Sequence, residues 1–407
     1  MNQLVAAALS ASAAEEEVAG VVRAAAAARQ PLLVEGNGTK AGMLRPVQAA
    51  QTVSAAGLSG ITLYAPKELI ISALAGTPLS EIEATLAASG QHLIAEPPDL
   101  SALLGSAGKP QTLGGVVATN LSGPRRIAWG AMRDHVMGMR AVTGRAEVIH
   151  SGGRVLKNVT GLDLCKLLAG SHGTLGVITE ITLKVLPAPP MTGTLALPRL
   201  DAAAGVQVLS AALGSPFSVS AAAWLPANAT QRVPGLDGLA GGVALVRIED
   251  FPSSVEYRLG RLREQFSIAG DLLLDTEASK ALWQAVGNAA PLAPSLSDAV
   301  WRVSVRPSAG PAVLAAVAPH GVSGFLDWGG GLVWLTGPAD AATHAAVEAA
   351  AVAGRGVWTL LRAPDALRGA VRVVPDEPAA LSRITRAVKE ALDPAGILNP
   401  GRIYAGL

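Results

Sequence analysis

The chain has 407 residues, half of them apolar, which is enough for two or three packed units and more than one core normally holds. Its formal net charge of +1 gives no electrostatic reason to expect a nucleic acid or an anionic membrane as a partner. Only 15% of the residues are charged, a low share that an alanine-rich composition and a partner-covered surface both explain.

A single cysteine, Cys165, excludes internal disulfides, Cys-ligated iron–sulfur clusters and cysteine-based zinc sites, and fits a reducing compartment. The N-terminus lacks a Lys- or Arg-led region, so we expect no signal peptide. The longest uncharged stretches, residues 202–231 and 307–326, are interrupted by Gly, Pro and Ser, so we expect no membrane span. The sequence therefore predicts a soluble, cytoplasmic protein that binds no nucleic acid.

The first 105 residues predict a small α+β unit. Residues 15–29 have acids in the first turn and arginines later, which favours a helix. Residues 31–34 are a short apolar strand that enters a glycine-containing loop. Residues 61–65 and 69–75 predict strands, and residues 78–89 predict a helix because proline stands at its start and apolar residues follow at helical spacing.

Residues 106–188 predict a second α+β unit. Strands are expected within residues 136–150, at 155–156 and at 178–185, and a short helix at 163–168. Prolines at 187, 189 and 190 predict a domain boundary near residue 188.

Residues 189–370 alternate between alanine-rich helices, at 202–213, 254–267 and 341–353, and strands, at 243–249, 301–305 and 331–335. This order predicts an antiparallel sheet with helices on one face. A last helix at 377–392 and a tail complete a C-terminal segment, residues 371–407, which follows this third unit.

Three glycine-rich segments carry the candidate chemistry. In the first, residues 36–39, glycines permit positive φ, so that successive N–H groups can converge on an anion, and Thr39 adds a hydroxyl. The second, residues 110–120, places paired glycines between Thr112 and Thr119, and the third, residues 170–179, leads from glycines into a strand. Each segment alone is also compatible with an ordinary tight turn.

Two common nucleotide motifs are missing from the sequence. No Gly-x-Gly-x-x-Gly opens a helix after a strand, and no Gly-Lys-Ser/Thr occurs. Their absence disfavours a nicotinamide-binding Rossmann enzyme and a nucleoside triphosphatase.

Taken together and in order, several segments resemble the FAD-binding domain of the vanillyl-alcohol oxidase family, also called the PCMH type. The resemblance implies an α+β fold in which two α+β subdomains, residues 1–105 and 106–188, clamp an extended FAD. It also implies an α+β cap domain at 189–370 with an antiparallel sheet, and a C-terminal return to the flavin domain. The resembling segments are residues 34–40, 75–79, 112–123, 133–136, 173–185 and 392–402.

Within that family the chain is similar to the FAD-binding E subunits of bacterial glycolate oxidases, at residues 95–99, 123–126, 156–163 and 326–330. The resemblance implies a complex with a second flavin subunit and an iron–sulfur subunit. Such a complex oxidises glycolate, a small 2-hydroxy acid, to glyoxylate and passes electrons toward the respiratory chain. It would hold this chain peripherally at the inner face of the cell membrane.

The resemblance also implies a set of FAD contacts, made mainly by backbone groups. The first loop would hold the pyrophosphate, the second segment would line the ribityl and isoalloxazine region, and the third segment and the tail would support the ring. The implied contact residues are Gly36, Asn37, Gly38, Thr39, Lys40, Pro110, Thr112, Leu113, Gly114, Gly115, Thr119, Asn120, Gly173, Gly176, Ile178 and Asn399. No catalytic residue and no metal ligand is assigned.

The chain departs from the family pattern in two ways. Covalently flavinylated relatives carry a histidine in the first loop, which is absent here, so we expect dissociable FAD. Relatives that oxidise 2-hydroxy acids carry a Glu-His-Gly segment in the cap, whereas this region has only His320 and His344. The second departure argues that substrate oxidation resides in a sister subunit. A self-sufficient 2-hydroxy-acid dehydrogenase and a structural subunit without redox function remain the alternatives.

Five single residues have competing interpretations. His172 is a candidate base, although local packing is the commoner role for such a histidine. Arg125 and Arg126 could neutralise phosphate, dock a partner or lie on the surface. Cys165 is predicted to be a buried, inert thiol, and Asp327 to stabilise a turn.

Overall fold

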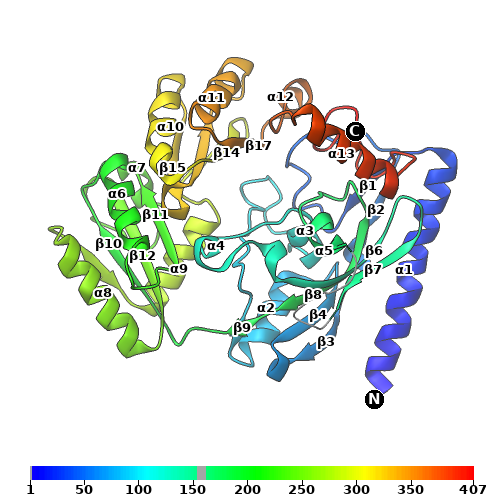
Figure 1. Ribbon diagram of the computed structural model, residues 1–407, viewed down its shortest axis with the longest axis horizontal. Helices are drawn as coiled ribbons and strands as arrows, with labels where there is room; N and C mark the ends of the chain where they lie inside the picture. Colours follow the sequence, from blue (N-terminus) through cyan, green and yellow to red (C-terminus); the bar gives the residue numbers. More distant parts are fainter. Residues whose placement is uncertain (1, 154–161) are drawn as a thin grey trace.

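The computed structural model describes residues 2–153 and 162–407 and has two lobes (Figure 1). We call the elements from the N-terminus to residue 187 the first lobe and the elements from residue 191 to residue 362 the second lobe. The predicted strand at 155–156 lies outside the described residues, as does most of the resembling segment at 156–163.

The first lobe is built on a five-stranded antiparallel sheet in the order β3-β4-β8-β6-β7. Its central strand β8 alternates between buried and half-buried residues, as expected for a sheet with one covered face. The strands are β3 (Ile61–Ala65), β4 (Ile70–Leu74), β6 (Val136–Val142), β7 (Val148–Gly152) and β8 (Val177–Lys184).

Two short sheets flank this one. A parallel pair joins β1 (Leu32–Glu35) to β2 (Gln51–Ser54), and an antiparallel pair joins β5 (Gln91–His92) to β9 (Leu186–Pro187). Because β9 includes Pro187, regular pairing continues into the proline-rich segment, and β10 begins as early as Met191. The chain therefore passes between the lobes through only a few residues.

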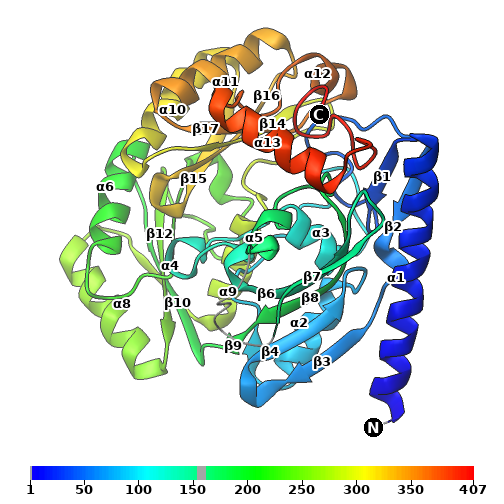
Figure 2. The same cartoon turned by 45° about the vertical axis from the view of Figure 1, so that its right-hand side comes forward.

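Five α-helices lie in the part of the first lobe that the structure describes. The first is much longer than the sequence predicts, since it begins at Asn2 and runs along the edge of the lobe (Figure 2). The second glycine-rich segment also departs from the expected loop, because its middle part forms helix α3 with Thr112 as the N-cap. The helices are α1 (Asn2–Ala28), α2 (Leu79–Ala87), α3 (Leu113–Ala118), α4 (Arg126–Trp129) and α5 (Leu164–Leu168).

The second lobe is an eight-stranded antiparallel sheet in the order β13-β10-β12-β11-β15-β16-β14-β17. Its central strands are buried along nearly their whole length. The strands are β10 (Met191–Leu197), β11 (Ala221–Leu225), β12 (Val243–Asp250), β13 (Leu272–Leu274), β14 (Ala299–Ser304), β15 (Ser323–Asp327), β16 (Leu332–Gly337) and β17 (Val357–Arg362).

Four helices cover the outer face of this sheet. They are α6 (Ala202–Leu213), α8 (Pro252–Phe266), α10 (Gly310–Val317) and α11 (Ala341–Ala353) (Figure 1). The sequence predicts three of them, with α6 and α11 at their observed bounds, but it does not predict α10. The short α7 (Ala227–Thr230) follows β11.

One helix departs from the prediction that helices lie on one face. Helix α9 (Thr276–Gly287) packs on the inner face, because Trp283 donates a hydrogen bond to Thr194 of β10 (2.9 Å), whereas the next residue, Gly193, faces Val255 and Leu259 of α8. A β-strand turns successive residues to opposite faces. The inner face of the second lobe, with α9 on it, therefore looks toward the first lobe.

After β17 the chain returns to the first lobe. Helices α12 (Asp365–Ala370) and α13 (Ala379–Leu392) are followed by a tail whose Leu398 pairs in parallel with Leu32 of β1. The buried Lys389 ammonium binds the Asp393 carboxylate (2.8 Å) and the carbonyl groups of Thr174 and Leu398. This cluster fixes the tail against the third glycine-rich segment.

Candidate functional site

A pocket with about 760 Å³ of empty space opens where the three glycine-rich segments meet the C-terminal tail. It brings together residues that lie far apart in the sequence, from β1, α3, the start of β8 and the tail. Of the predicted contact residues, Gly36, Asn37, Gly38, Thr39, Lys40, Thr112, Gly114, Gly115, Thr119, Gly173, Gly176, Ile178 and Asn399 line it.

The loop after β1 presents bare backbone amides to this pocket. Among the described residues, no acceptor takes a hydrogen bond from the N–H group of any residue from Gly36 to Lys40. Gly38 has φ +69°, a conformation that turns neighbouring N–H groups toward one side. A Cβ at Gly36 would stand 2.4 Å from Thr112 Oγ1, so a side chain there would collide with the N-cap of α3. The loop is thus a cradle for an anion.

The second segment contributes the N-terminal turn of α3. Thr112 Oγ1 accepts a hydrogen bond from Gly115 N (3.3 Å). A Cβ on Gly114 would lie 2.8 Å from the Cβ of Ala75, so this glycine permits close packing of α3 on the residue that follows β4. The paired glycines therefore serve helix packing as well as access to the pocket.

Three predicted residues lie outside the pocket. Leu113 is buried in the core, and Pro110 stands behind the loop, where its carbonyl accepts a hydrogen bond from Asn37 Nδ2 (2.9 Å). Asn120 has φ +49°, and its side-chain oxygen accepts a hydrogen bond from Arg133 N (2.9 Å). These contacts are internal to the protein.

Asn399 ties the tail to two walls of the pocket. Its side-chain oxygen accepts a hydrogen bond from Val34 N (2.8 Å), and its Nδ2 donates to Val34 O (3.1 Å) and to His172 O (2.8 Å). The Gly173 position has φ +72° and lies against this amide. Asn399 thereby sets the distance between the first and third glycine segments.

Two cations line the pocket without a carboxylate at ion-pair distance in the described part of the chain. Lys40 Nζ donates to Gln111 Oε1 (3.2 Å) and Thr39 Oγ1 (3.3 Å), and burial lowers its pKa to about 8 against the attraction of Asp99. Arg402 donates to main-chain carbonyls, and burial together with Arg368 lowers its pKa to about 10. The sequence reasoning did not assign Arg402 to the site, although it lies in the resembling tail.

His172 also lines the pocket. Burial and the Arg402 charge lower its pKa to about 3, so the imidazole is neutral at physiological pH. Its φ of +54° and the contacts of its main chain with Ala118 and Asn399 give it a structural role. Cys165 is buried, as predicted, and burial raises the pKa of its thiol.

A second cavity, with about 1330 Å³ of empty space, lies between the lobes. It adjoins the first pocket, because Gln111 in its wall binds Lys40 in the wall of the other. Its first-lobe wall comes from residues 96–101, 108–111 and 124–125, and its second-lobe wall comes from β10, β12 and α9. The two spaces are therefore neighbours, with the contact between Lys40 and Gln111 at their boundary.

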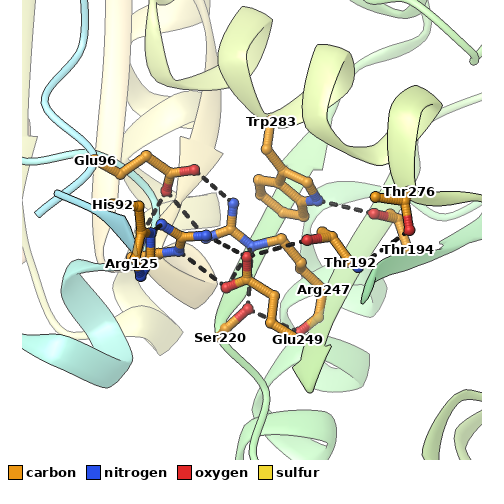
Figure 3. A network of polar contacts seen from close by, with 10 residues as sticks. All are labelled: His92, Glu96, Arg125, Thr192, Thr194, Ser220, Arg247, Glu249, Thr276 and Trp283. Carbon is orange, nitrogen blue, oxygen red and sulfur yellow. Dashed lines mark hydrogen bonds and ion pairs between the residues drawn. The ribbon is translucent and has the colours of Figure 1, made fainter. Parts of the chain in front are cut away.

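Ion pairs cross between the lobes at the wall of this cavity (Figure 3). Arg247 of β12 binds both carboxylate oxygens of Glu96 (2.8 and 3.0 Å), and Arg125 of the first lobe binds both oxygens of Glu249 of β12. Arg125 Nη1 also lies 2.6 Å from His92 Nδ1. Each lobe therefore supplies one arginine and one glutamate, and we call these four residues the interlobe network.

The network keeps its glutamates ionised. Although burial opposes ionisation, Arg247 and Arg125 hold the pKa of Glu249 at about 2, and the same arginines lower the pKa of Glu96. Burial and Arg125 lower the pKa of His92 to about 4, which leaves its ring neutral. Neither Arg125 nor Arg126 lines the first pocket, so the interpretation that they neutralise phosphate there finds no support.

Arg126 and its neighbours make a second contact between the lobes. Its guanidinium lies 4.8 Å from the centre of the Trp328 ring, and Trp328 Nε1 donates to Gly123 O (3.2 Å). Arg302 of β14 approaches the same ring (5.5 Å). Asp327 accepts a hydrogen bond from Trp328 N, which is the turn role predicted, and burial raises its pKa to about 7.

Two features are absent from residues 2–153 and 162–407. No helix there is both long and apolar enough to cross a membrane, and no three side chains of His, Cys, Asp or Glu gather as metal ligands would.

The comparisons with known proteins agree with this geometry. Residues 6–152 match the family model of the FAD binding domain. The chain is 33% identical to "Glycolate oxidase subunit GlcE" of Escherichia coli (strain K12) over 93% of its length and 94% of that protein. It is 39% identical to "Glycolate oxidase subunit GlcD" of Bacillus subtilis (strain 168), but over only 24% of its length and 20% of that protein.

Among solved structures, p-cresol methylhydroxylase with substrate bound superposes with a TM-score of 0.72 over 96% of this chain and 87% of that chain, at 15% identity. This likeness shows that the two share a fold. Fold, pocket and family model together define the chain as an FAD-dependent oxidoreductase with a PCMH-type α+β fold. More narrowly, the chain belongs to the family of the glycolate oxidase subunit GlcE.

Proposed function

We propose that this chain is the FAD-binding subunit of a glycolate oxidase complex, which oxidises glycolate to glyoxylate with flavin-mediated electron transfer. The observation that carries the proposal is the match to a glycolate oxidase subunit over nearly the whole of both chains, combined with an anion-binding pocket built from the shared segments. A match confined to the first lobe would support only a flavin-binding domain and would not indicate which reaction the protein takes part in.

The pocket fits the cofactor. A diphosphate carries negative charge and needs several donors, and the loop from Gly36 to Lys40 offers successive free N–H groups with Lys40 and Arg402 beside them. Apolar residues such as Ala55, Ala75 and Ile178 line the remaining surface, where a flat ring can pack. We propose that the predicted contact residues that line this pocket hold FAD without a covalent bond.

Bound FAD supplies the ability to take up an electron pair and to release electrons to a redox partner. The chain's own groups do the rest. The loop amides and the two cations hold the diphosphate, the α3 turn and the tail fix the width of the pocket, and the inner face of the second lobe forms one wall of the adjoining cavity.

We propose further that this subunit relays electrons and that a sister subunit oxidises the substrate. A 2-hydroxy acid needs a cation for its carboxylate and a base for its hydroxyl proton. Both arginines in the wall of the interlobe cavity are already bound to glutamates, and the histidine beside them, His92, has a lowered pKa and contacts Arg125. These two arginines and His92 are therefore held in contacts within the protein.

One anaerobic experiment tests this assignment. The purified chain is loaded with FAD and titrated with glycolate, first alone and then with the co-expressed subunits of its complex, while flavin absorbance is recorded. We expect bleaching only in the complex. Bleaching of the isolated chain would instead identify a self-sufficient 2-hydroxy-acid dehydrogenase, and a chain that binds no FAD at all would identify a structural subunit. Acid precipitation should release the flavin into solution.

The proposal also covers the domains of the chain, its partner subunits and its location in the cell. Residues 1–188 would form the flavin domain, 189–370 the cap and 371–407 a segment that closes the flavin site. A second flavin subunit and an iron–sulfur subunit would be the partners, in the cytoplasm and peripherally at the inner face of the cell membrane. Co-purification from membrane and soluble fractions with a tag on this chain checks both points.

A further inference from the structure

Helix α13 buries a lysine and leaves apolar residues exposed. Lys389 is buried in contact with Asp393, and Thr385 donates a hydrogen bond to Glu377 (2.9 Å). The helix lies on the outside of the molecule, where Figure 2 shows it running across the front. An amphipathic surface helix normally buries its apolar side. In α13 part of the apolar side is instead exposed, while Val388 and Leu392 are half-buried.

The outward side of α13 is an apolar seam. Ala380, Ile384, Ala387 and Ala391 are all exposed and follow one another at intervals of four, three and four residues. This spacing places them in one row along the helix, as in the seam of a coiled coil. Ile384 is 60% exposed and, beside the row, Leu381 is 48% exposed. Alanines in such a row permit a close approach of a second helix.

Different side chains flank the two edges of this seam. Arg383 and Glu390 lie along one edge, both exposed, and neither forms an ion pair with any described residue. Leu381 and Val388 lie along the other edge. One edge thus carries opposite charges seven residues apart, and the other carries two apolar residues seven residues apart.

We propose that the seam of α13 binds the α13 seam of a second copy of this chain, antiparallel, around a two-fold axis. In that arrangement Ile384 faces Ala387 of the other copy, and Ala380 faces Ala391. The same symmetry brings Arg383 of each copy to Glu390 of the other, and Leu381 of each copy to Val388 of the other. An isologous contact requires a surface that is complementary to itself, and this seam meets the requirement in both shape and charge.

The contact is small. Helix α13 has 14 residues, and at 1.5 Å per residue its seam is about 20 Å long. A single helix pair falls at the low end of stable interfaces, so the dimer should dissociate on dilution, with a dissociation constant on the order of micromolar. The proposal is independent of the glycolate oxidase assignment and goes beyond it.

Light scattering after gel filtration tests the dimer, with flavin-loaded full-length chain over a concentration series from about 1 to 100 μM. We expect the mass to rise with concentration from that of one chain, 41.1 kDa, toward twice that value. Ile384→Asp should abolish the rise, whereas Phe251→Ser, which removes a comparably exposed side chain on the second lobe, should leave it unchanged. Retained flavin binding in every variant controls for folding.

Charge reversal then tests the arrangement. Arg383→Glu places two glutamates opposite each other at both ends of the proposed contact, so the dissociation constant of the dimer should rise at least about tenfold. The double variant R383E/E390R restores opposite charges, so its dissociation constant should lie within about threefold of the parent value. A chain that stays monomeric at every concentration overturns the proposal, whether the seam then proves to bind a sister subunit or lipid vesicles. A dimer that persists in Ile384→Asp, or that the double variant does not restore, also overturns it.

Discussion

Arg402 is buried and Lys40 is half-buried in the pocket that we propose to hold FAD, and the reason for their position is physical. Burying a charge without a partner is costly, and the lowered pKa values of about 8 and about 10 express that cost. Neither has a carboxylate at ion-pair distance in the described part of the chain, and both lie beside the loop whose N–H groups are free. A bound diphosphate would compensate both charges and those N–H groups together.

The first prediction concerns the pH dependence of FAD binding through Lys40. In the free protein the ammonium group loses its proton as the pH rises through about 8, and a bound anion raises its pKa. FAD affinity should therefore be highest below pH 8 and should fall as the pH rises above it. Flavin fluorescence titrations at pH 6.5 to 9.5 measure the effect.

The matched variants are Lys40→Ala and Lys67→Ala, the second at an exposed lysine of the first lobe. Lys40→Ala should weaken FAD binding by about tenfold at pH 7 and should flatten the decline above pH 8, because a charge-assisted hydrogen bond contributes about 1.5 kcal/mol or more. Lys67→Ala should change neither. An unchanged pH profile in Lys40→Ala would show that another group titrates.

At the scale of single elements, the tail after α13 and strand β1 depend on one another. Strand β1 has only β2 beside it in the sheet, and the tail occupies its other edge through the Leu32–Leu398 bridge. Asn399 completes the contact and adopts φ +42°, a conformation that asparagine tolerates better than most residues. The tail thus protects an edge strand and shapes the pocket at the same time.

The second prediction is that Asn399→Ala destabilises the protein. The change removes three hydrogen bonds and leaves Val34 N and His172 O without their partner, which should lower the free energy of unfolding by about 3 kcal/mol. Urea unfolding measures it, and the exposed Asn228→Ala should stay within about 0.5 kcal/mol of the parent. Equal stability of the two variants would contradict the role given to Asn399.

For the whole molecule, the relative position of the lobes depends on a few reciprocal contacts. In the interlobe network, an arginine of each lobe binds a glutamate of the other lobe. In addition, Trp328 of the second lobe donates a hydrogen bond to Gly123 of the first lobe. Buried ion pairs contribute modestly to net stability but are costly to break singly, because the remaining charge stays buried. The network therefore specifies one arrangement of the lobes, and with it the shape of the interlobe cavity.

The third prediction is a measurable coupling between Arg125 and Glu249. Arg125→Met alone should lower the free energy of unfolding by about 3 kcal/mol, and R125M/E249Q should cost at least about 1 kcal/mol less than the sum of its single variants. The exposed pair Arg261–Glu264 is the control, and its coupling should stay below about 0.5 kcal/mol. Additive losses at Arg125 and Glu249 would mean that the pair does not act as a unit.

The fourth prediction follows from the lowered pKa of Glu249. The group stabilises the folded state fully above its unfolded pKa of about 4.3, and this stabilisation is lost as the pH falls from there toward the folded value of about 2. Stability should therefore decline below about pH 5, and Glu249→Gln should be less sensitive to acid than the parent. Unfolding curves at pH 3 to 7 decide the point.

Sequence reasoning succeeded where local chemistry decides the structure. The bounds of α6 and α11 follow from Asp201 and Asp340, whose carboxylates accept hydrogen bonds from the first helical turns. The glycine segments were found because positive φ and close packing leave a signature in residue type. Helix α3 was missed because the paired glycines suggested a loop, whereas packing on Ala75 favours a helix.

The sequence by itself determined the three glycine-rich segments, the α+β composition and the missing loop histidine, because each depends on neighbours within a few residues. It also indicated the family, because the resembling segments follow one another in order along the chain. Only the tertiary structure brought Arg402 and Asn399 to the pocket, set α9 on the inner face, paired Arg125 with Glu249 and turned the apolar seam of α13 outward. These features depend on contacts between segments that lie from tens to hundreds of residues apart. These contacts form only when the lobes and the tail pack against one another. A pattern of neighbouring residues in the sequence does not contain that information.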